Sequence, residues 1–252
     1  MLRVMTYNIS FGGVDDDGTD RLPLIQEVVR TARPDVLAIQ EANEFELRAH
    51  RRRFAFEAAT GLRGLLGLSP SGFHGALFTR HDLQPVALWT EIPPGNRRME
   101  LLLRAPSGLE LTVCSVHLDA ISPETRLAGA HYLPAAPPAI VMGDFNNYRS
   151  DDPDAAQAFA TSAPRRRARS GVTQVDDRLF GVLERAGYAD LFRRFRPGER
   201  GETIREPPLR LDYIFATEDL AQRAIRCDVL RTPDTERASD HYPVLADFEL
   251  DP

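Results

Sequence analysis

The sequence contains no lysine, so all 31 of its basic residues are arginines. Schiff-base chemistry and lysine nucleophiles are therefore excluded, whereas every cationic side chain is a planar guanidinium suited to binding phosphate. Cysteine is also scarce, because only Cys114 and Cys227 occur, each within an apolar stretch. Without a Cys-x-x-Cys pair we expect no thiolate zinc site, and we predict two buried thiols rather than a disulfide.

Long apolar runs are absent as well, so we expect neither a membrane-spanning helix nor a stable membrane association. The first eight residues alternate as in a β-strand and lack the apolar segment of a signal peptide, which predicts a cytoplasmic protein. A net charge of −6 argues against nonspecific wrapping of nucleic acid. The single tryptophan gives little support for a base-stacking platform.

Short apolar stretches with the pattern of β-strands recur along the chain and alternate with helical patterns near its start. The expected strands are Leu2–Tyr7, Val36–Ile39, Ala76–Thr79, Val86–Trp89, Glu100–Leu103, Leu109–Leu118, Ala139–Met142, Leu211–Ala216 and Val244–Phe248. The expected helices are Leu22–Ala32, Glu44–Thr60, Pro123–Leu133 and Asp177–Ala186. Because the middle strands follow one another without helices, they indicate antiparallel pairs within a mixed α/β layered fold.

Polar side chains recur at the ends of these strands. Asp144 and Asn146 follow a buried strand two residues apart, so in an extended chain both side chains point the same way. Asp212 lies inside an apolar strand, where a carboxylate needs a partner such as a histidine. Any one of these residues alone fits a turn or a structural role. Polar residues of one chemical kind nevertheless occur at six separate apolar strands, and together they indicate a site. Its candidate residues are Asn8, Glu41, His117, Asp144, Asn146, Asp212, Asp240 and His241.

The chemistry of these side chains limits the reaction. Carboxylates and amides without thiolates favour a hard cation with oxygen ligands, either Mg²⁺ or Mn²⁺. Two histidines beside such an ion suit hydrolysis at phosphorus, in which one group positions or deprotonates water and another supports the developing charge.

In their order along the chain, these motifs resemble the endonuclease/exonuclease/phosphatase superfamily. That superfamily contains pancreatic-type deoxyribonucleases, abasic-site endonucleases, neutral sphingomyelinases and inositol polyphosphate 5-phosphatases. The matching segments are Thr6-Tyr7-Asn8, Pro34–Glu41, Ser115–Leu118, Gly143–Asn146, Arg210–Ile214 and Ser239–Pro243. The resemblance implies a single domain over residues 1–252, folded as a four-layered α/β sandwich of two mixed sheets between helices.

The resemblance also implies a role for each candidate residue. Glu41 would be the main metal ligand, Asn8 would lie beside it, and Asp240 would be a second acid of the metal site. Asp144 and Asn146 would orient the water and the phosphate. Asp212 would hydrogen-bond His241, and His117 would contact the phosphate. Both Asp144 and His241 remain candidates for accepting the proton.

The substrate is less constrained. Abasic-site endonucleases have a Tyr-Val-Pro-Asn-type segment where this chain has Val116-His117-Leu118-Asp119, which argues against that activity. We predict a monomeric Mg²⁺-dependent phosphodiesterase acting on nucleic acid or a nucleotide. One alternative is a phosphatase or phosphodiesterase acting on a small phosphoester or a lipid headgroup. Another is an inactive phosphate-binding or nucleic-acid-binding module, which the presence of Glu41, Asp144 and His241 opposes. Arg165–Arg169 is either a solvated loop or a phosphate clamp.

Overall fold

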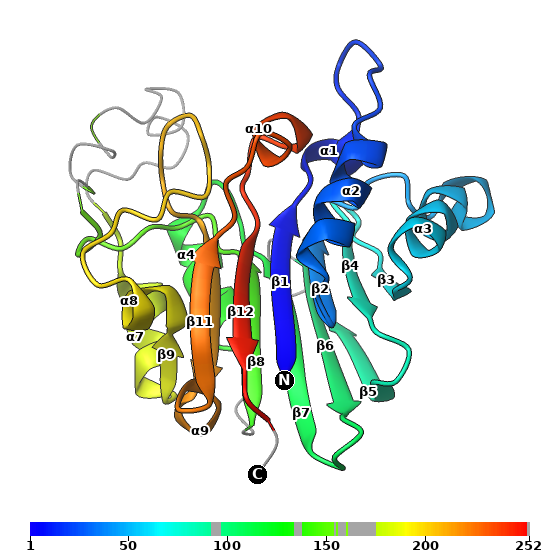
Figure 1. Ribbon diagram of the computed structural model, residues 1–252. Coiled ribbons are helices and arrows are strands. Elements are labelled where there is room, and N and C mark those ends of the chain that lie inside the picture. The colour runs from blue at the N-terminus through cyan, green and yellow to red at the C-terminus, as the bar shows by residue number, and fades with distance from the viewer. Residues whose placement is uncertain (92–96, 134–137, 154, 156–159, 161–174, 251–252) are drawn as a thin grey trace.

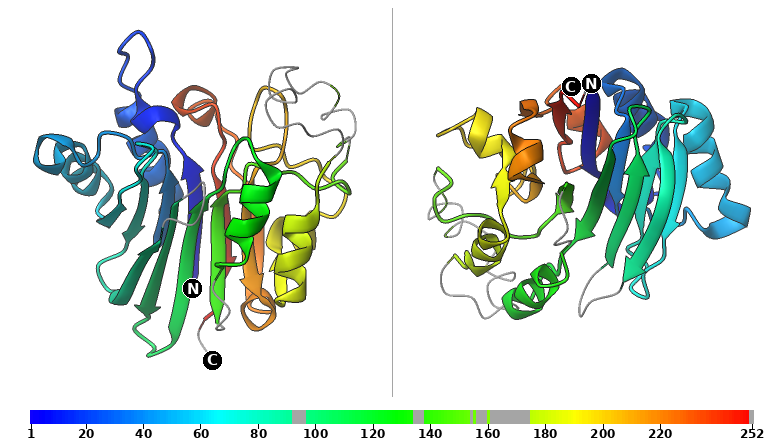
Figure 2. Two further views of the ribbon diagram at one scale, coloured as in Figure 1. Left: turned by 180° about the vertical axis from the view of Figure 1, so that it is seen from behind. Right: turned by 90° about the horizontal axis from the view of Figure 1, so that it is seen from below.

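The computed structural model describes residues 1–91, 97–133, 138–153, 155, 160 and 175–250. Two six-stranded sheets pack face to face, with helices on their outer sides (Figures 1 and 2). The first sheet has the order β11-β12-β1-β2-β4-β3 and the second β5-β6-β7-β8-β10-β9. This arrangement confirms the four-layered α/β sandwich that the resemblance implies. The arginine-rich segment Arg165–Arg169, predicted to be either a solvated loop or a phosphate clamp, lies outside the described residues.

The strands of the first sheet are β1 (Leu2–Asn8), β2 (Val36–Gln40), β3 (Arg63–Gly67), β4 (Gly75–Thr79), β11 (Ala224–Val229) and β12 (Val244–Phe248). Those of the second are β5 (Gln84–Glu91), β6 (Arg97–Arg104), β7 (Glu110–His117), β8 (Ala139–Asp144), β9 (Tyr188–Asp190) and β10 (Asp212–Thr217). Both sheets are mixed, because β1 pairs with β2 and β7 pairs with β8 in parallel, whereas the other pairs are antiparallel.

The apolar strands are buried on both faces. On β2, Val36 and Ala38 pack between the sheets, whereas Leu37 and Ile39 pack beneath the helices. Because successive strand residues point to opposite faces, a strand enclosed in this way needs a continuous apolar run rather than an alternating one. These runs are the pattern from which the central strands were predicted.

The helices covering the sheets are α1 (Ser10–Gly13), α2 (Leu22–Ala32), α3 (Leu47–Thr60), α4 (Pro123–Ala130), α7 (Arg178–Arg185), α8 (Leu191–Phe195), α9 (Glu218–Ala221) and α10 (Thr235–Ala238). The sequence predicts the longer helices α2, α3, α4 and α7 but not the short α1, α8, α9 and α10. The predicted stripe of α2 is buried, with Leu22, Ile25 and Val28 packed against the first sheet. In the described part of the chain, no helix has the length and apolar character needed to cross a membrane.

Several elements differ from the prediction. The strands β3, β9 and β11 were missed, and the helix expected to begin at Glu44 begins at Leu47. The first turn of α3 is irregular, because Arg48, Ala49 and His50 have positive φ angles. Both cysteines are buried free thiols, as predicted.

Candidate active site

The strand registers bring the predicted polar residues to one end of both sheets. Asn8 ends β1 beside the end of its parallel neighbour β2, which Glu41 follows directly. In the second sheet, His117 of β7 is opposite Asp144 of β8, and Asp144 is opposite Asp212 of β10. In Figure 1 this end lies at the top, near α1 and α10 and away from both termini.

Carboxylates from the two sheets meet at one amide. Asn8 Nδ2 donates to Glu41 Oε1 at 3.2 Å and to Asp144 Oδ2 at 3.1 Å. His117 Nε2 lies 4.0 Å from the same oxygen of Glu41 and 3.7 Å from that of Asp144. Asn8 Oδ1 accepts a hydrogen bond from Ser10 N at 3.0 Å. Two converging carboxylates repel each other, so a divalent cation with oxygen ligands would relieve their charge.

The turn Ser10–Gly13 holds Glu41 in place. Phe11 N donates to Glu41 Oε2 at 2.9 Å, and Gly12 N donates to the backbone oxygen of Glu41 at 2.8 Å. Glu41 itself has a φ of +59°. A Cβ atom on Gly12 would lie 2.2 Å from the backbone oxygen of Asn43, so this close approach requires glycine. The backbone nitrogen of Phe11 and the amide of Asn8 therefore position the side chain of Glu41.

Asp144 is oriented in a similar way. Its Oδ1 accepts from Asn146 N at 2.7 Å, which leaves Oδ2 facing Asn8. Asn146 has a φ of +47°, and its Nδ2 donates to the Leu118 backbone oxygen at 2.9 Å. The preceding Gly143 allows β8 to approach β7, because a Cβ atom there would lie 1.9 Å from the Val116 backbone oxygen. The Gly-Asp-Phe-Asn segment thus places one carboxylate oxygen in the site.

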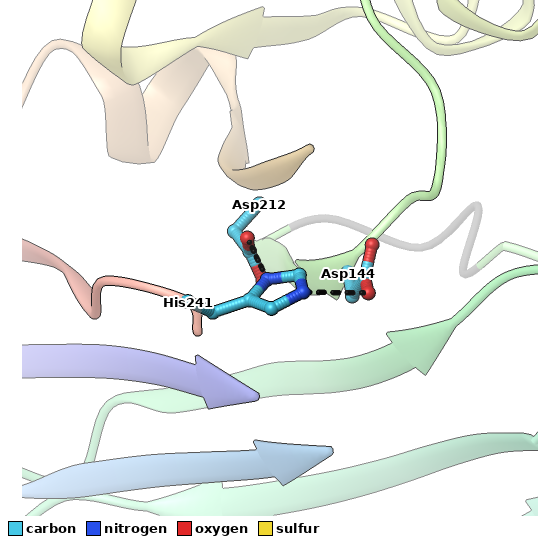
Figure 3. A group of neighbouring side chains, drawn as sticks. All are labelled: Asp144, Asp212 and His241. Carbon is cyan, nitrogen blue, oxygen red and sulfur yellow. Dashed lines mark hydrogen bonds and ion pairs between the residues drawn. The ribbon is translucent and has the colours of Figure 1, made fainter. Parts of the chain in front are cut away.

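His241 bridges two aspartates (Figure 3). Its Nδ1 lies 2.8 Å from Asp212 Oδ2, and its Nε2 lies 4.0 Å from Asp144 Oδ2. Burial raises the pKa of Asp212 to about 6, with Asp144 acting in the same direction and His241 opposing it. Burial lowers the pKa of His241, but Asp212, Asp144 and Asp240 outweigh it and raise that pKa to about 10. At neutral pH, Asp212 and His241 therefore form a buried ion pair.

One predicted residue lies outside this group. Asp240 is exposed, and its Oδ1 accepts from Ser239 Oγ at 3.3 Å. Its metal-site role stays a prediction. Asp144, Asp212 and His241 also bring one ligand atom each within 4.8 Å of one another. An imidazolium of His241 paired with Asp212 would repel a cation placed among these three residues.

Thr203 belongs to this site although its sequence context does not indicate it. Its Oγ1 accepts from the backbone nitrogens of Leu211 and Asp212, each at 2.9 Å. Its backbone oxygen accepts from Tyr242 N at 2.6 Å, next to His241. Thr203 thus ties together the two segments that carry the ion pair. A single threonine in a polar, glycine- and proline-rich segment gives no sequence signal for this function.

Comparisons with known proteins identify the family and the fold. The sequence matches the profile of the Endonuclease/Exonuclease/phosphatase family over residues 5–241. A 3′-5′ exonuclease from Neisseria meningitidis is similar with a TM-score of 0.72 and 20% identity, covering 98% of this chain and 100% of that chain. An AP endonuclease from Archaeoglobus fulgidus has a TM-score of 0.70 and 20% identity, covering 99% and 100%. The human Nocturnin catalytic domain with bound sulfate has a TM-score of 0.70 and 19% identity, covering 98% and 94%.

A search of curated proteins found no match. The family profile nevertheless spans nearly the whole chain, and the structural similarity extends over nearly all of it. The chain therefore belongs to the endonuclease/exonuclease/phosphatase family.

Proposed function

We propose that this protein is a divalent-metal-dependent phosphodiesterase that cleaves P–O bonds of nucleic acid or nucleotides. The observation that carries the proposal is the meeting of Glu41 and Asp144 from separate sheets beside the His241–Asp212 ion pair. Family membership supports phosphoester hydrolysis. The similar structures include a 3′-5′ exonuclease, an AP endonuclease and a 3′ phosphatase bound to a DNA hairpin, which support a nucleic-acid substrate.

A metal ion fits the oxygen atoms at the centre of the site. Glu41 Oε1 and Asp144 Oδ2 both accept hydrogen bonds from the amide nitrogen of Asn8, so these two carboxylates would hold the ion and Asn8 would lie beside it. Mg²⁺ fits best, with Mn²⁺ as a substitute, because such ions prefer oxygen ligands and retain sites for water and phosphate. When bound, the ion would neutralise charge on the phosphoryl oxygens.

The protein's own side chains divide the remaining work. Asp144 Oδ2 and His241 Nε2 are 4.0 Å apart, so one water or phosphate oxygen can hydrogen-bond both. A His241 held as an imidazolium donates to the phosphoryl oxygen rather than accepting a proton. Proton acceptance from water therefore falls to Asp144. His117 Nε2 points at the same carboxylates and would donate to a second phosphate oxygen.

A screen of substrates tests the proposal. Plasmid DNA, short single strands, RNA, bis-p-nitrophenyl phosphate and p-nitrophenyl phosphate would each be incubated with Mg²⁺, with Mn²⁺ and with EDTA. We expect turnover of diesters, its loss in EDTA and its return with either metal, and D144N is the inactive control. Turnover of monoesters alone would indicate a small-molecule phosphatase instead. Full turnover in EDTA would refute the metal requirement, and no turnover with tight metal binding would indicate an inactive binding module.

A further inference from the structure

Three aromatic rings form a row that leads from the surface to the candidate active site. The rings of Phe11 and Phe73 have centroids 5.6 Å apart and are tilted by 60°. The next step is an edge contact between Phe73 and His117, with centroids 6.2 Å apart. His117 in turn lies within 4.0 Å of the carboxylates of Glu41 and Asp144. An aromatic surface, here called the Phe11–Phe73 row, is therefore continuous with the group that would bind phosphate.

Core packing does not explain this row. Phe11 is 57% exposed, although it belongs to the same short turn that fixes Glu41. Four consecutive residues, Ser10 to Gly13, have positive φ angles, and Phe11 has a φ of +52°. A phenylalanine disfavours this left-handed conformation because of its Cβ atom. Strain of this kind persists at functional sites, where it fixes the direction of a side chain.

The position of the row defines what it can bind. Because the row begins at His117, a group stacked on these rings would lie next to a phosphate bound by that residue. The group must also be flat and have apolar faces to stack on phenylalanine. Every nucleobase meets both conditions. On the basis of the proposed function, we infer that the Phe11–Phe73 row stacks the nucleobase next to the scissile phosphate.

Two features favour a base over a lipid chain. Leu68 is also exposed in the loop that carries Phe73, but Ser69 and Ser71 lie between these two residues in sequence and hydrogen-bond each other at 2.8 Å. This polar loop does not provide the continuous apolar surface that an acyl chain would require. A base in an intact duplex is stacked on its neighbours, so a base that reaches the row must be unpaired. The favoured substrate is therefore a nucleotide, a single strand or a frayed end.

The kinetic test compares two short single strands that each contain one cleavable phosphodiester among methylphosphonate linkages. One strand has thymine beside the cleavable linkage, and the other has a tetrahydrofuran abasic residue at that position, with both the 5′ and 3′ sides tested. For the wild-type protein, loss of the base on one side should lower kcat/KM by about 5- to 150-fold, as expected for one base stacked on an aromatic ring. F11A should cleave both strands equally slowly, whereas F11W should recover the preference.

Phe54 provides a matched control. It is 51% exposed, like Phe11, but it lies on α3 and contacts His50 and Arg53 rather than the site. F54A should therefore retain the wild-type preference for the base. If F11A lowers kcat/KM for both strands by the same factor, Phe11 acts through Glu41 and the inference is wrong. It is also wrong if F11A abolishes binding to phosphatidylserine vesicles while the base makes no difference to cleavage.

A binding measurement separates this inference from the proposed function. Binding of a phosphorothioate dinucleotide carrying 2-aminopurine would be followed by fluorescence in Mg²⁺, which requires no turnover. F11A and F73A should raise Kd by about 5- to 150-fold relative to the wild type and F54A. Equal Kd values would overturn the stacking inference even if diesters are hydrolysed. A raised Kd in a protein that hydrolyses no substrate would support stacking and refute the proposed activity.

Discussion

Replacing Asp212 by asparagine tests whether this carboxylate acts through His241. The two side chains are 2.8 Å apart and almost fully buried. Asparagine keeps the volume and removes the negative charge that raises the pKa of His241. The imidazole of the variant should therefore lose its proton at lower pH and no longer donate strongly to a phosphoryl oxygen.

The magnitude for the metal-free protein follows from the pKa of His241. A rise from 6.5 to about 10 corresponds to roughly 5 kcal/mol, and removing one partner of a buried ion pair costs about 3–5 kcal/mol. Because the folded state binds this proton more tightly, the stabilisation is fully present below pH 6.5 and is lost as the pH rises through about 10. Asp212 also binds its proton more tightly in the folded state than in the unfolded state. This tighter binding adds to the free energy of unfolding at low pH, and the addition is lost as the pH rises through about 6.

Two assays follow from these values. In EDTA, chemical denaturation should show D212N to be less stable than the wild type near neutral pH, with a difference that shrinks toward pH 10. In Mg²⁺, kcat of D212N should fall by about 10²- to 10⁴-fold, the usual contribution of general acid–base catalysis. H241A and the double variant should be nearly equal in kcat, because residues that act as one unit are not additive.

Asp247 provides a control for the loss of a buried, paired carboxylate that lies outside the site. It is 4% exposed and accepts from Arg3 at 2.7 and 2.9 Å, but it lies outside the site. D247N should lose stability and retain kcat. If the kinetic losses of D212N and H241A multiply in the double variant, the two residues act independently and the pairing argument is refuted.

Three further predictions concern Glu41, Thr203 and Arg210. Glu41→Gln should weaken Mg²⁺ binding in calorimetry and lower kcat by about 100-fold or more, whereas Glu44→Gln, an exposed neighbour, should change neither. Thr203→Val should lose about 1–3 kcal/mol of unfolding free energy through unpaired buried amides and lower kcat, and Thr203→Ser should restore both. Arg210→Met should lose about 3–5 kcal/mol in urea denaturation, because Arg210 is 1% exposed and pairs with two buried aspartates; unchanged stability would contradict this.

The central strands were predictable because burial on both faces leaves a continuous apolar run. The strands that were missed lack this pattern for different reasons. Two of the five residues of β3 are glycines, Gly64 and Gly67, and β9 has three residues in all. In β11, Ile225 and Arg226 are both exposed, because this strand lies at the edge of its sheet. Edge strands are defined by their neighbours more than by their own composition.

The candidate site was predictable to the extent that its residues follow apolar strands. Asn8, Glu41 and Asp144 could be identified because each stands where such a strand ends. The contacts between them could not be derived from spacing, since they depend on how the two sheets pack. Thr203 acts through hydrogen bonds to backbone groups of other segments, and no periodic pattern encodes such contacts.

The division between strands and loops explains why the chemistry was easier to infer than the substrate. Asn8, Asp144 and Asp212 are at most 2% exposed and lie on paired strands, so their positions depend on the whole core. Phe11 is exposed in the short α1 and Phe73 lies on the loop between β3 and β4, where side chains can change without disturbing that core. A fold of this kind can keep one reaction while its loops select different substrates. Changes at Phe11 and Phe73 should therefore alter which phosphoester is cleaved, whereas changes at Asn8, Asp144 or Asp212 should lower cleavage of every substrate.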